Sequence, residues 1–175
     1  TWADLLLLSS ENLPDAKELN AFHRFVREAV AENRPWDRFV RDIVTASGNT
    51  TDNGAANYFL MHREIADLTE TTSQAFLGTS ITCARCHNHP LEKWTQNDYY
   101  GFANLFARVT IKNGKTGGND VISGAFGDVL HPLYAKAMAP KPLDGAVLAE
   151  GSESRRAYLA EWLTAPDNPY FTRAI

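Results

Sequence analysis

Long apolar runs and clusters of basic residues are both missing from this sequence. Its longest apolar run is the four leucines from Leu5 to Leu8, far short of the roughly 20 residues that cross a bilayer. Lysine and arginine are scattered along the chain, and the formal net charge is −4. This charge pattern gives no sign of a surface for nucleic acid or for an anionic membrane. We therefore expect neither a membrane span in this segment nor a nucleic-acid partner.

Cysteine is equally scarce. The chain has two cysteines, Cys83 and Cys86, and both lie in the stretch TCARCHNHP beside His87 and His89. A chain of 175 residues with 44% apolar composition can build a core without disulfide or metal staples. The cysteines are therefore available for chemistry.

Most of the chain has the periodicity of helices. Apolar residues recur at three- and four-residue spacing, which is the pattern of helices that bury one face. β-branched runs occur at 108–114 and 120–130, where short strands or a hairpin are expected. The predicted fold class is mainly α, a helical domain with a small β-hairpin element. Helices are predicted at 1–10, 14–33, 36–47, 65–77, 95–109 and 152–163, a polar loop at 48–54, an irregular proline-rich loop at 131–146, and a further helix opening after Pro169.

The spacing Cys-x-x-Cys-His carries the strongest chemical signal. Residues three and four apart share one side of a helical turn, so Cys83, Cys86 and His87 are expected to face the same way. Two thiols in that arrangement can form thioethers with the two vinyl groups of a haem while the imidazole binds the iron. This is the standard signature of c-type haem attachment. We therefore predict one covalent haem c.

Other uses of the two cysteines stay open. A redox dithiol of the thioredoxin type expects a βαβ context, whereas a helix is predicted before Cys83. Zinc is the alternative cofactor, with Cys83, Cys86 and either His87 or His89 as ligands and a fourth ligand from elsewhere. A structural disulfide or a chance match is the remaining interpretation. Haem is favoured because all three residues of its signature are present.

The segment QAFLGTSITCARCHNHPLEKWTQNDYYGFANLFARV, residues 74–109, resembles a cytochrome-c-like domain of unknown function from Planctomycetes and related bacteria. Residues 22–49 are similar to the helical part of the same domain. Residues 155–175 resemble the opening of a second uncharacterised domain that usually follows it. The resemblance implies a cytochrome-c-like haem-binding domain at 1–145, with short strands near 108–130, and the beginning of a following helical domain at 146–175. It further implies a piece of a larger, exported, multidomain protein.

Site residues also follow from the resemblance. It implies that Cys83 and Cys86 attach the haem and that His87 is the proximal ligand. His89 matches the family motif too, but it lies on another side of the turn. We expect it to donate a hydrogen bond to a haem propionate or to the backbone, and a second metal is the alternative.

The distal iron ligand is left open by the sequence. Met138 lies in a proline-rich loop, as a distal methionine often does in small cytochromes c. His131 and His62 are the alternative distal ligands, and an open or water-ligated site is the last option. Each residue also has a structural interpretation: Met138 can fill a gap in the core, His131 can hydrogen-bond within the turn before Pro132, and His62 can be an exposed partner of Glu64.

The predicted function is electron transfer within a periplasmic or cell-surface protein, with a redox partner protein or neighbouring domains of the same chain as partners. Two alternatives are kept: part of a haem-dependent redox enzyme that oxidises peroxide or a carbohydrate, and a zinc-stabilised interaction module. The sequence contains no catalytic triad, paired carboxylates or phosphate-binding loop, so catalytic residues are not predicted and enzymatic activity is left open.

Overall fold

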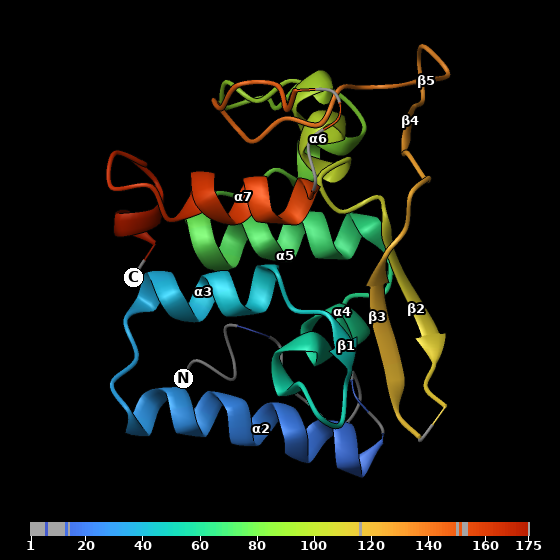
Figure 1. The fold of residues 1–175 in the computed structure, drawn as a ribbon. Helices are drawn as coiled ribbons and strands as arrows, with labels where there is room; N and C mark the ends of the chain where they lie inside the picture. The colour runs from blue at the N-terminus through green and yellow to red at the C-terminus, as the bar shows by residue number, and fades with distance from the viewer. Residues whose placement is uncertain are drawn as a thin grey trace. The chain divides into compact units, whose positions relative to one another are not determined.

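A computed structural model describes Leu6, Leu13 and residues 15–115, 117–149, 151 and 154–174. The predicted helix at 1–10 lies outside these described residues, apart from Leu6. Within them the fold is mainly α-helical with a small β element, as predicted (Figure 1). The chain forms two compact units, and each is described by itself. The first comprises the described residues up to Glu64 together with Val109–Gly124, and the second comprises Ile65–Arg108 and the chain from Ala125 onward.

Two helices of the first unit lie within the ranges that the sequence predicts, and their ends differ by up to three residues. The carboxylate of Asp15 accepts hydrogen bonds from the backbone N–H groups of Lys17 and Glu18, which satisfies two of the open donors of the first turn. The next helix follows after Pro35 and presents four apolar side chains to the core. A short helix that follows these two in the sequence was not predicted. The elements are α2 (Ala16–Ala31), α3 (Trp36–Val44), the 3₁₀ turn η1 (Gly54–Ala56) and α4 (Asn57–Met61).

A three-stranded antiparallel sheet completes the first unit. Strands β2 (Val109–Asn113) and β3 (Asn119–Ser123) form the predicted hairpin, with Ile111 opposite Val121. Strand β1 (Gly48–Asn49) pairs with the other edge of β3, so the strand order is β1-β3-β2. The prediction of a loop throughout 48–54 was therefore wrong at its first two residues. A two-residue strand has no alternation to reveal it, and its partner lies about 70 residues further along the chain.

Beside this sheet, three buried polar residues and the half-buried Asn119 are joined by hydrogen bonds. The Thr50 hydroxyl donates to the Glu18 carboxylate at 2.6 Å, and the Asn119 side-chain amide donates to the same oxygen at 2.8 Å. The Asn57 amide donates to the Thr50 carbonyl at 2.7 Å. We call Glu18, Thr50, Asn57 and Asn119 the buried polar cluster. It ties α2 and the start of α4 to the sheet without leaving the Glu18 carboxylate unpaired.

The second unit contains the remaining helices and a two-stranded ladder. The predicted proline-rich loop is in part wrong, because β4 and β5 pair within it, with Leu130 opposite Ala137 and His131 opposite Lys136. The helix predicted at 95–109 ends at Ala103, and Leu105 and Phe106 are buried in the turns that follow. The elements are α5 (Ile65–Leu77), η2 (Thr82–Arg85), α6 (Gln96–Ala103), β4 (Leu130–His131), β5 (Lys136–Ala137), α7 (Arg155–Leu163) and η3 (Phe171–Arg173).

Asn104, fully buried at the end of α6, explains how the irregular ladder is fixed. Its side-chain amide donates to the carbonyls of Val129 and Met138, both at 3.0 Å, and its side-chain oxygen accepts from the Val129 N–H at 2.7 Å. One residue thus holds the chain just before β4 and just after β5. Side-chain bonding, more than strand propensity, defines this ladder.

Two sequence-based expectations about organisation have different outcomes. Among the described helices, none is long and apolar enough to cross a membrane. The boundary predicted between 145 and 146 does not coincide with the division into compact units, which places α7 in the same unit as α5 and α6. Compact units and recurring sequence domains are different divisions of a chain, so the predicted boundary stays a prediction.

Candidate functional site

We call residues 82–94 the motif loop. The chain that leads into this loop leaves α5 at a glycine. Gly78 has φ of +60°, a backbone conformation that favours glycine, and its N–H donates to the Gln74 carbonyl at 3.2 Å. The Ser73 hydroxyl then donates to the Thr79 carbonyl at 2.6 Å. These contacts end α5 and turn the chain into η2.

Burial alternates sharply along η2. Ile81 and Ala84 are fully buried, whereas Cys83 and Cys86 are exposed and carry free thiols. The backbone N–H groups of Cys86 and His87 both lie 3.3 Å from the Cys83 carbonyl. The turn is therefore closed by its backbone and anchored by its apolar residues. Both thiols are left on the outside, and the prediction that they share one side of the turn with His87 stays a prediction.

His87 follows the second cysteine and is also exposed. Its Nδ1 lies 2.7 Å from the Asn88 carbonyl oxygen, which can only accept a hydrogen bond. Nδ1 must therefore carry the proton and donate. In the neutral ring this leaves the lone pair on Nε2, the atom that is available to a metal.

The ring of His89 has the opposite arrangement. Its Nδ1 accepts from the backbone N–H groups of Leu91, at 3.2 Å, and Glu92, at 2.9 Å. In the neutral ring Nε2 then carries the proton and offers no lone pair. The expected hydrogen bond to the backbone is present, but the ring accepts it instead of donating it. His89 thereby shapes the turn at 89–92.

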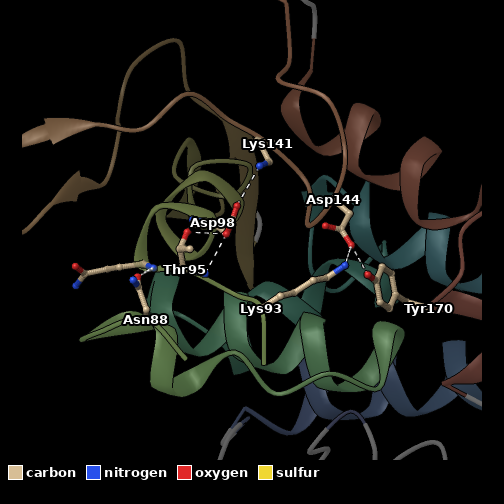
Figure 2. Close-up of polar contacts among 8 residues, drawn as sticks. Asn88, Lys93, Thr95, Asp98, Lys141, Asp144 and Tyr170 are labelled. Carbon is tan, nitrogen blue, oxygen red and sulfur yellow. Dashed lines mark hydrogen bonds and ion pairs between the residues drawn. The ribbon is translucent and has the colours of Figure 1, made fainter. Parts of the chain in front are cut away.

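Helix α6 is the support on which the motif loop rests. The predicted capping box is present: the Thr95 hydroxyl is 3.2 Å from the Asp98 N–H, and the Thr95 N–H donates to the Asp98 carboxylate at 3.0 Å (Figure 2). Lys141 adds an ion pair to Asp98 at 3.0 Å. Burial alone would raise the pKa of Asp98, but the bonds from Thr95 and Lys141 outweigh it and lower that pKa.

The far end of the motif loop is held by a second set of contacts. The Lys93 ammonium pairs with the Asp144 carboxylate, and the Tyr170 hydroxyl donates to the same group (Figure 2). The ammonium also lies 4.8 Å from the centre of the Trp94 ring, and Trp94 is buried. The motif loop is therefore bonded to the rest of the second unit at both ends.

The two tyrosines of α6 connect the loop to neighbouring elements. Tyr99 donates its hydroxyl to Glu70 at 3.0 Å, and burial together with that carboxylate raises the pKa of Tyr99. The Tyr100 hydroxyl lies 3.3 Å from the carbonyl of Arg85, one of the two residues between the cysteines. The Tyr100 ring also contacts His131, at 5.0 Å between ring centres. Tyr100 thus joins the motif loop to β4.

His131 is buried in an aromatic setting. Its ring lies between Tyr100 and Tyr134, and its Nδ1 accepts from the Leu133 N–H at 3.2 Å. That bond is the turn contact considered in the sequence analysis. It places the proton of the neutral ring on Nε2, which has no hydrogen-bond partner among the described residues. His131 would have to give up the Leu133 bond before Nε2 could bind a metal in the neutral form.

Met138 and His62 lie in different surroundings. Met138 is half-buried and lines a cavity of about 540 Å³ together with Arg108, Asp128 and Arg155. His62 belongs to the first unit, where it follows α4 and lies edge-on to the Tyr58 ring at 4.9 Å. The expectation of an exposed His62 was wrong, because the residue is 4% exposed. The identity of the distal ligand stays a prediction.

Throughout the described part of the chain, no three His, Cys, Asp or Glu side chains are grouped so that they could hold a metal ion. The motif instead presents two thiols and one imidazole nitrogen, which fit a cofactor that is bound covalently and needs one protein ligand from this loop. This donor set fits haem c, with Cys83, Cys86 and His87 as the residues that would hold it.

Residues 1–111 match PSCyt2, a family described as a protein of unknown function (DUF1549). This chain belongs to the PSCyt2 family. The match includes the whole motif loop and α6, and it ends within β2. Neither the curated proteins nor the solved structures contain a match. The PSCyt2 description assigns no reaction, so the geometry of the motif loop carries the functional argument.

One residue of the site, Asn88, was missed in the sequence analysis. Its backbone carbonyl accepts from His87 Nδ1, and its side-chain oxygen accepts from the backbone N–H of Gln96 at the start of α6. Neither contact belongs to the Cys-x-x-Cys-His signature. The available signal was a short polar residue a few positions before a predicted capping box, since asparagine often serves as a hydrogen-bond acceptor near the start of a helix.

Proposed function

We propose that this PSCyt2 chain binds one haem c through thioethers at Cys83 and Cys86, with His87 as the proximal ligand, and serves electron transfer in a larger exported protein. The observation that carries the proposal is the His87 ring. Its Nδ1 donates to the Asn88 carbonyl, which leaves the Nε2 lone pair for a ligand, and the residue directly follows Cys86, one of the two exposed free cysteines of the motif. A hydrogen bond of this kind fixes the tautomer and raises the basicity of a ligating histidine.

Covalent attachment of haem requires one addition reaction at each cysteine. Each thiol adds across one vinyl group: the sulfur bonds to one vinyl carbon and the hydrogen goes to the other, so no atom leaves and no oxidant is required. Both thiols must be reduced and accessible for this addition, and both are free and exposed. When bound, haem supplies a one-electron ferric–ferrous couple.

The geometry supports haem better than zinc. A structural zinc site needs four protein ligands in a tetrahedron, and catalytic sites use three. No such grouping of three is present among the described residues. Zinc binding here would require a rearrangement of the motif loop, in particular of the His89 ring, whose Nδ1 holds the Leu91 and Glu92 amides.

Location and partners follow from the same proposal. Covalent haem attachment takes place outside the cytoplasm, which favours the periplasm or the cell surface. The electron donor or acceptor would be a redox partner protein or a neighbouring domain of the same chain. Peroxide or carbohydrate oxidation by a larger haem enzyme and a zinc-stabilised interaction module stay predictions.

The test is to produce the chain in the periplasm of a host that matures c-type cytochromes, and to analyse the purified protein for both cofactors. We expect one haem per chain that resists extraction after denaturation, with a reduced pyridine haemochrome spectrum typical of two thioether links. Metal analysis provides the opposing result. A colourless protein with one zinc ion per chain would refute the proposal and favour an interaction module.

A further inference from the structure

Asn88 contacts two parts of the second unit at once. Its backbone oxygen accepts from His87 Nδ1 at 2.7 Å. Its side-chain Oδ1 accepts from the backbone N–H of Gln96 at 3.0 Å. The residue that fixes the His87 ring is therefore itself fixed to the first residue of α6, and Figure 2 shows Asn88 beside the start of that helix.

Gln96 completes the connection from the other side. As the first residue of α6, it has a backbone N–H with no acceptor inside the helix, and Asn88 provides one. Its side-chain amide donates to the Arg85 carbonyl at 2.9 Å, and the residue is 6% exposed. The helix end is held independently by the Thr95–Asp98 capping box. Gln96 therefore contacts the motif loop at Arg85 and at Asn88, which lie on either side of Cys86 and His87 in the sequence.

We propose that Asn88 and Gln96 form a clamp that positions His87 as an iron ligand. This inference rests on the proposed function, because only a ligating His87 needs such positioning. Neither residue would touch the iron. Asn88 holds the carbonyl that accepts from Nδ1, and Gln96 keeps both Asn88 and the Arg85 carbonyl in place.

The clamp has a consequence for the electronic properties of the site. If Asn88 loses its side-chain acceptor, its peptide unit can rotate and its carbonyl no longer stays aligned with Nδ1. A weaker Nδ1 hydrogen bond makes the imidazole less basic and therefore stabilises the ferric state less. The reduction potential should then rise, although both thioethers and the iron ligand are still present.

The test compares four variants of the 175-residue chain: Asn88→Ala, Asn88→Asp, Gln96→Ala and, as the matched control, Asn97→Ala. Asn97 is exposed and occupies the first turn of the same helix. Two quantities are measured. One is the midpoint potential of the haem-loaded chain, and the other is the hydrogen-exchange rate of the Gln96 amide in the haem-free chain.

For Asn88→Ala we expect exchange at Gln96 to accelerate roughly fivefold, as for the loss of one hydrogen bond. A similar, roughly fivefold shift of the ferric–ferrous equilibrium towards ferrous corresponds to a potential higher by about 40 mV. Asn88→Asp keeps the acceptor, so Gln96 should stay protected and the potential should not rise. Gln96→Ala removes the Arg85 bond and should raise the potential by a smaller amount. Asn97→Ala should match the unaltered chain in both measurements.

The outcomes separate the clamp from the proposed function. If the unaltered chain takes up haem, Asn88→Ala and Gln96→Ala keep its potential, and Asn88→Ala keeps its Gln96 exchange rate, the clamp is refuted while haem binding stands. If the unaltered chain takes up no haem, both fall, because His87 then has no iron to bind. If Asn88→Ala does not fold, the contrast between Asn88→Asp and Gln96→Ala decides in the same way.

Discussion

Glu18 in the first unit and His87 in the second are both fixed by hydrogen bonds, but with different results for their remaining atoms. The Glu18 oxygen is shared by Thr50 and Asn119 inside a buried polar cluster, and Glu18 is 4% exposed. His87 uses one ring nitrogen for the Asn88 carbonyl and keeps the other towards solvent. The first arrangement satisfies polar groups with one another. The second leaves an atom for a ligand.

This difference separates a structural polar group from a functional one. Buried polar groups are expected to be paired within the protein, and the Glu18 carboxylate and the Thr50 hydroxyl of the buried polar cluster follow that rule. In the motif loop the hydrogen bonds fix the backbone and orient the His87 ring, but they leave the thiols of Cys83 and Cys86 unused. We infer that the first arrangement contributes stability and the second contributes binding. The following predictions test that division, beginning with the largest effect.

Replacing both thiols, in Cys83→Ser with Cys86→Ser, should abolish covalent haem attachment, from one haem per chain to none. The unfolding free energy of the haem-free chain should change by less than about 0.5 kcal/mol, because both side chains are exposed. Haem absorbance after denaturation and urea unfolding are the two measurements. Thr82→Ser, at the exposed position before Cys83, is the control and should keep its haem. A double variant that retains haem through denaturation would contradict attachment at these residues.

Removing the central carboxylate of the buried polar cluster, in Glu18→Ala, should destabilise the first unit by about 3 kcal/mol. Two short hydrogen bonds are lost, and the buried Thr50 hydroxyl and the half-buried Asn119 amide are left without this acceptor. Glu18→Gln keeps an oxygen acceptor and should lose less. Urea unfolding measures both, and Glu28→Ala on the exposed side of α2 is the control. A loss below about 1 kcal/mol for Glu18→Ala would mean that the cluster is not a major source of stability.

The smallest effect concerns the capping box of α6 and depends on pH. The lowered pKa of Asp98 means that its ionised form stabilises the fold. This contribution is complete above the unfolded pKa, about 3.9, and is lost as the pH falls through the lower native pKa. Asp98→Asn should therefore cost about 1 kcal/mol near pH 7, a typical value for a helix cap.

The difference between the unaltered chain and Asp98→Asn should shrink below pH of about 4 and vanish below the native pKa of Asp98. Unfolding is measured at a series of pH values. Asp67→Asn, an exposed carboxylate in the first turn of α5, serves as the control and should show a much weaker trend. A difference that is constant with pH would show that the charge of Asp98 is not what stabilises the cap.

Much of the fold could be predicted from local sequence patterns. Helical periodicity located α2, α3 and α5, and the Thr95–Asp98 pair correctly marked the start of α6. The β2–β3 hairpin followed from two β-branched runs around a glycine-rich turn. In each case the signal and the structure lie within the same short segment.

The missed features depend on partners that are distant in the sequence or on atoms of the backbone. Strand β1 pairs with β3 across about 70 residues, and the β4–β5 ladder is held by Asn104. The burial of His62 depends on packing against Tyr58. The contrast between His87 and His89 depends on whether Nδ1 faces a carbonyl or an N–H, which the spacing of residues does not reveal.

The most direct test of haem attachment is the intact mass of the denatured chain after expression with c-type haem maturation, beside a known cytochrome c matured in the same cells. The account predicts the mass of the chain plus one haem, because Cys83 and Cys86 are free and exposed and because the Asn88 contact leaves Nε2 of His87 available. A mass equal to the chain alone, while the reference cytochrome is fully loaded, would contradict it.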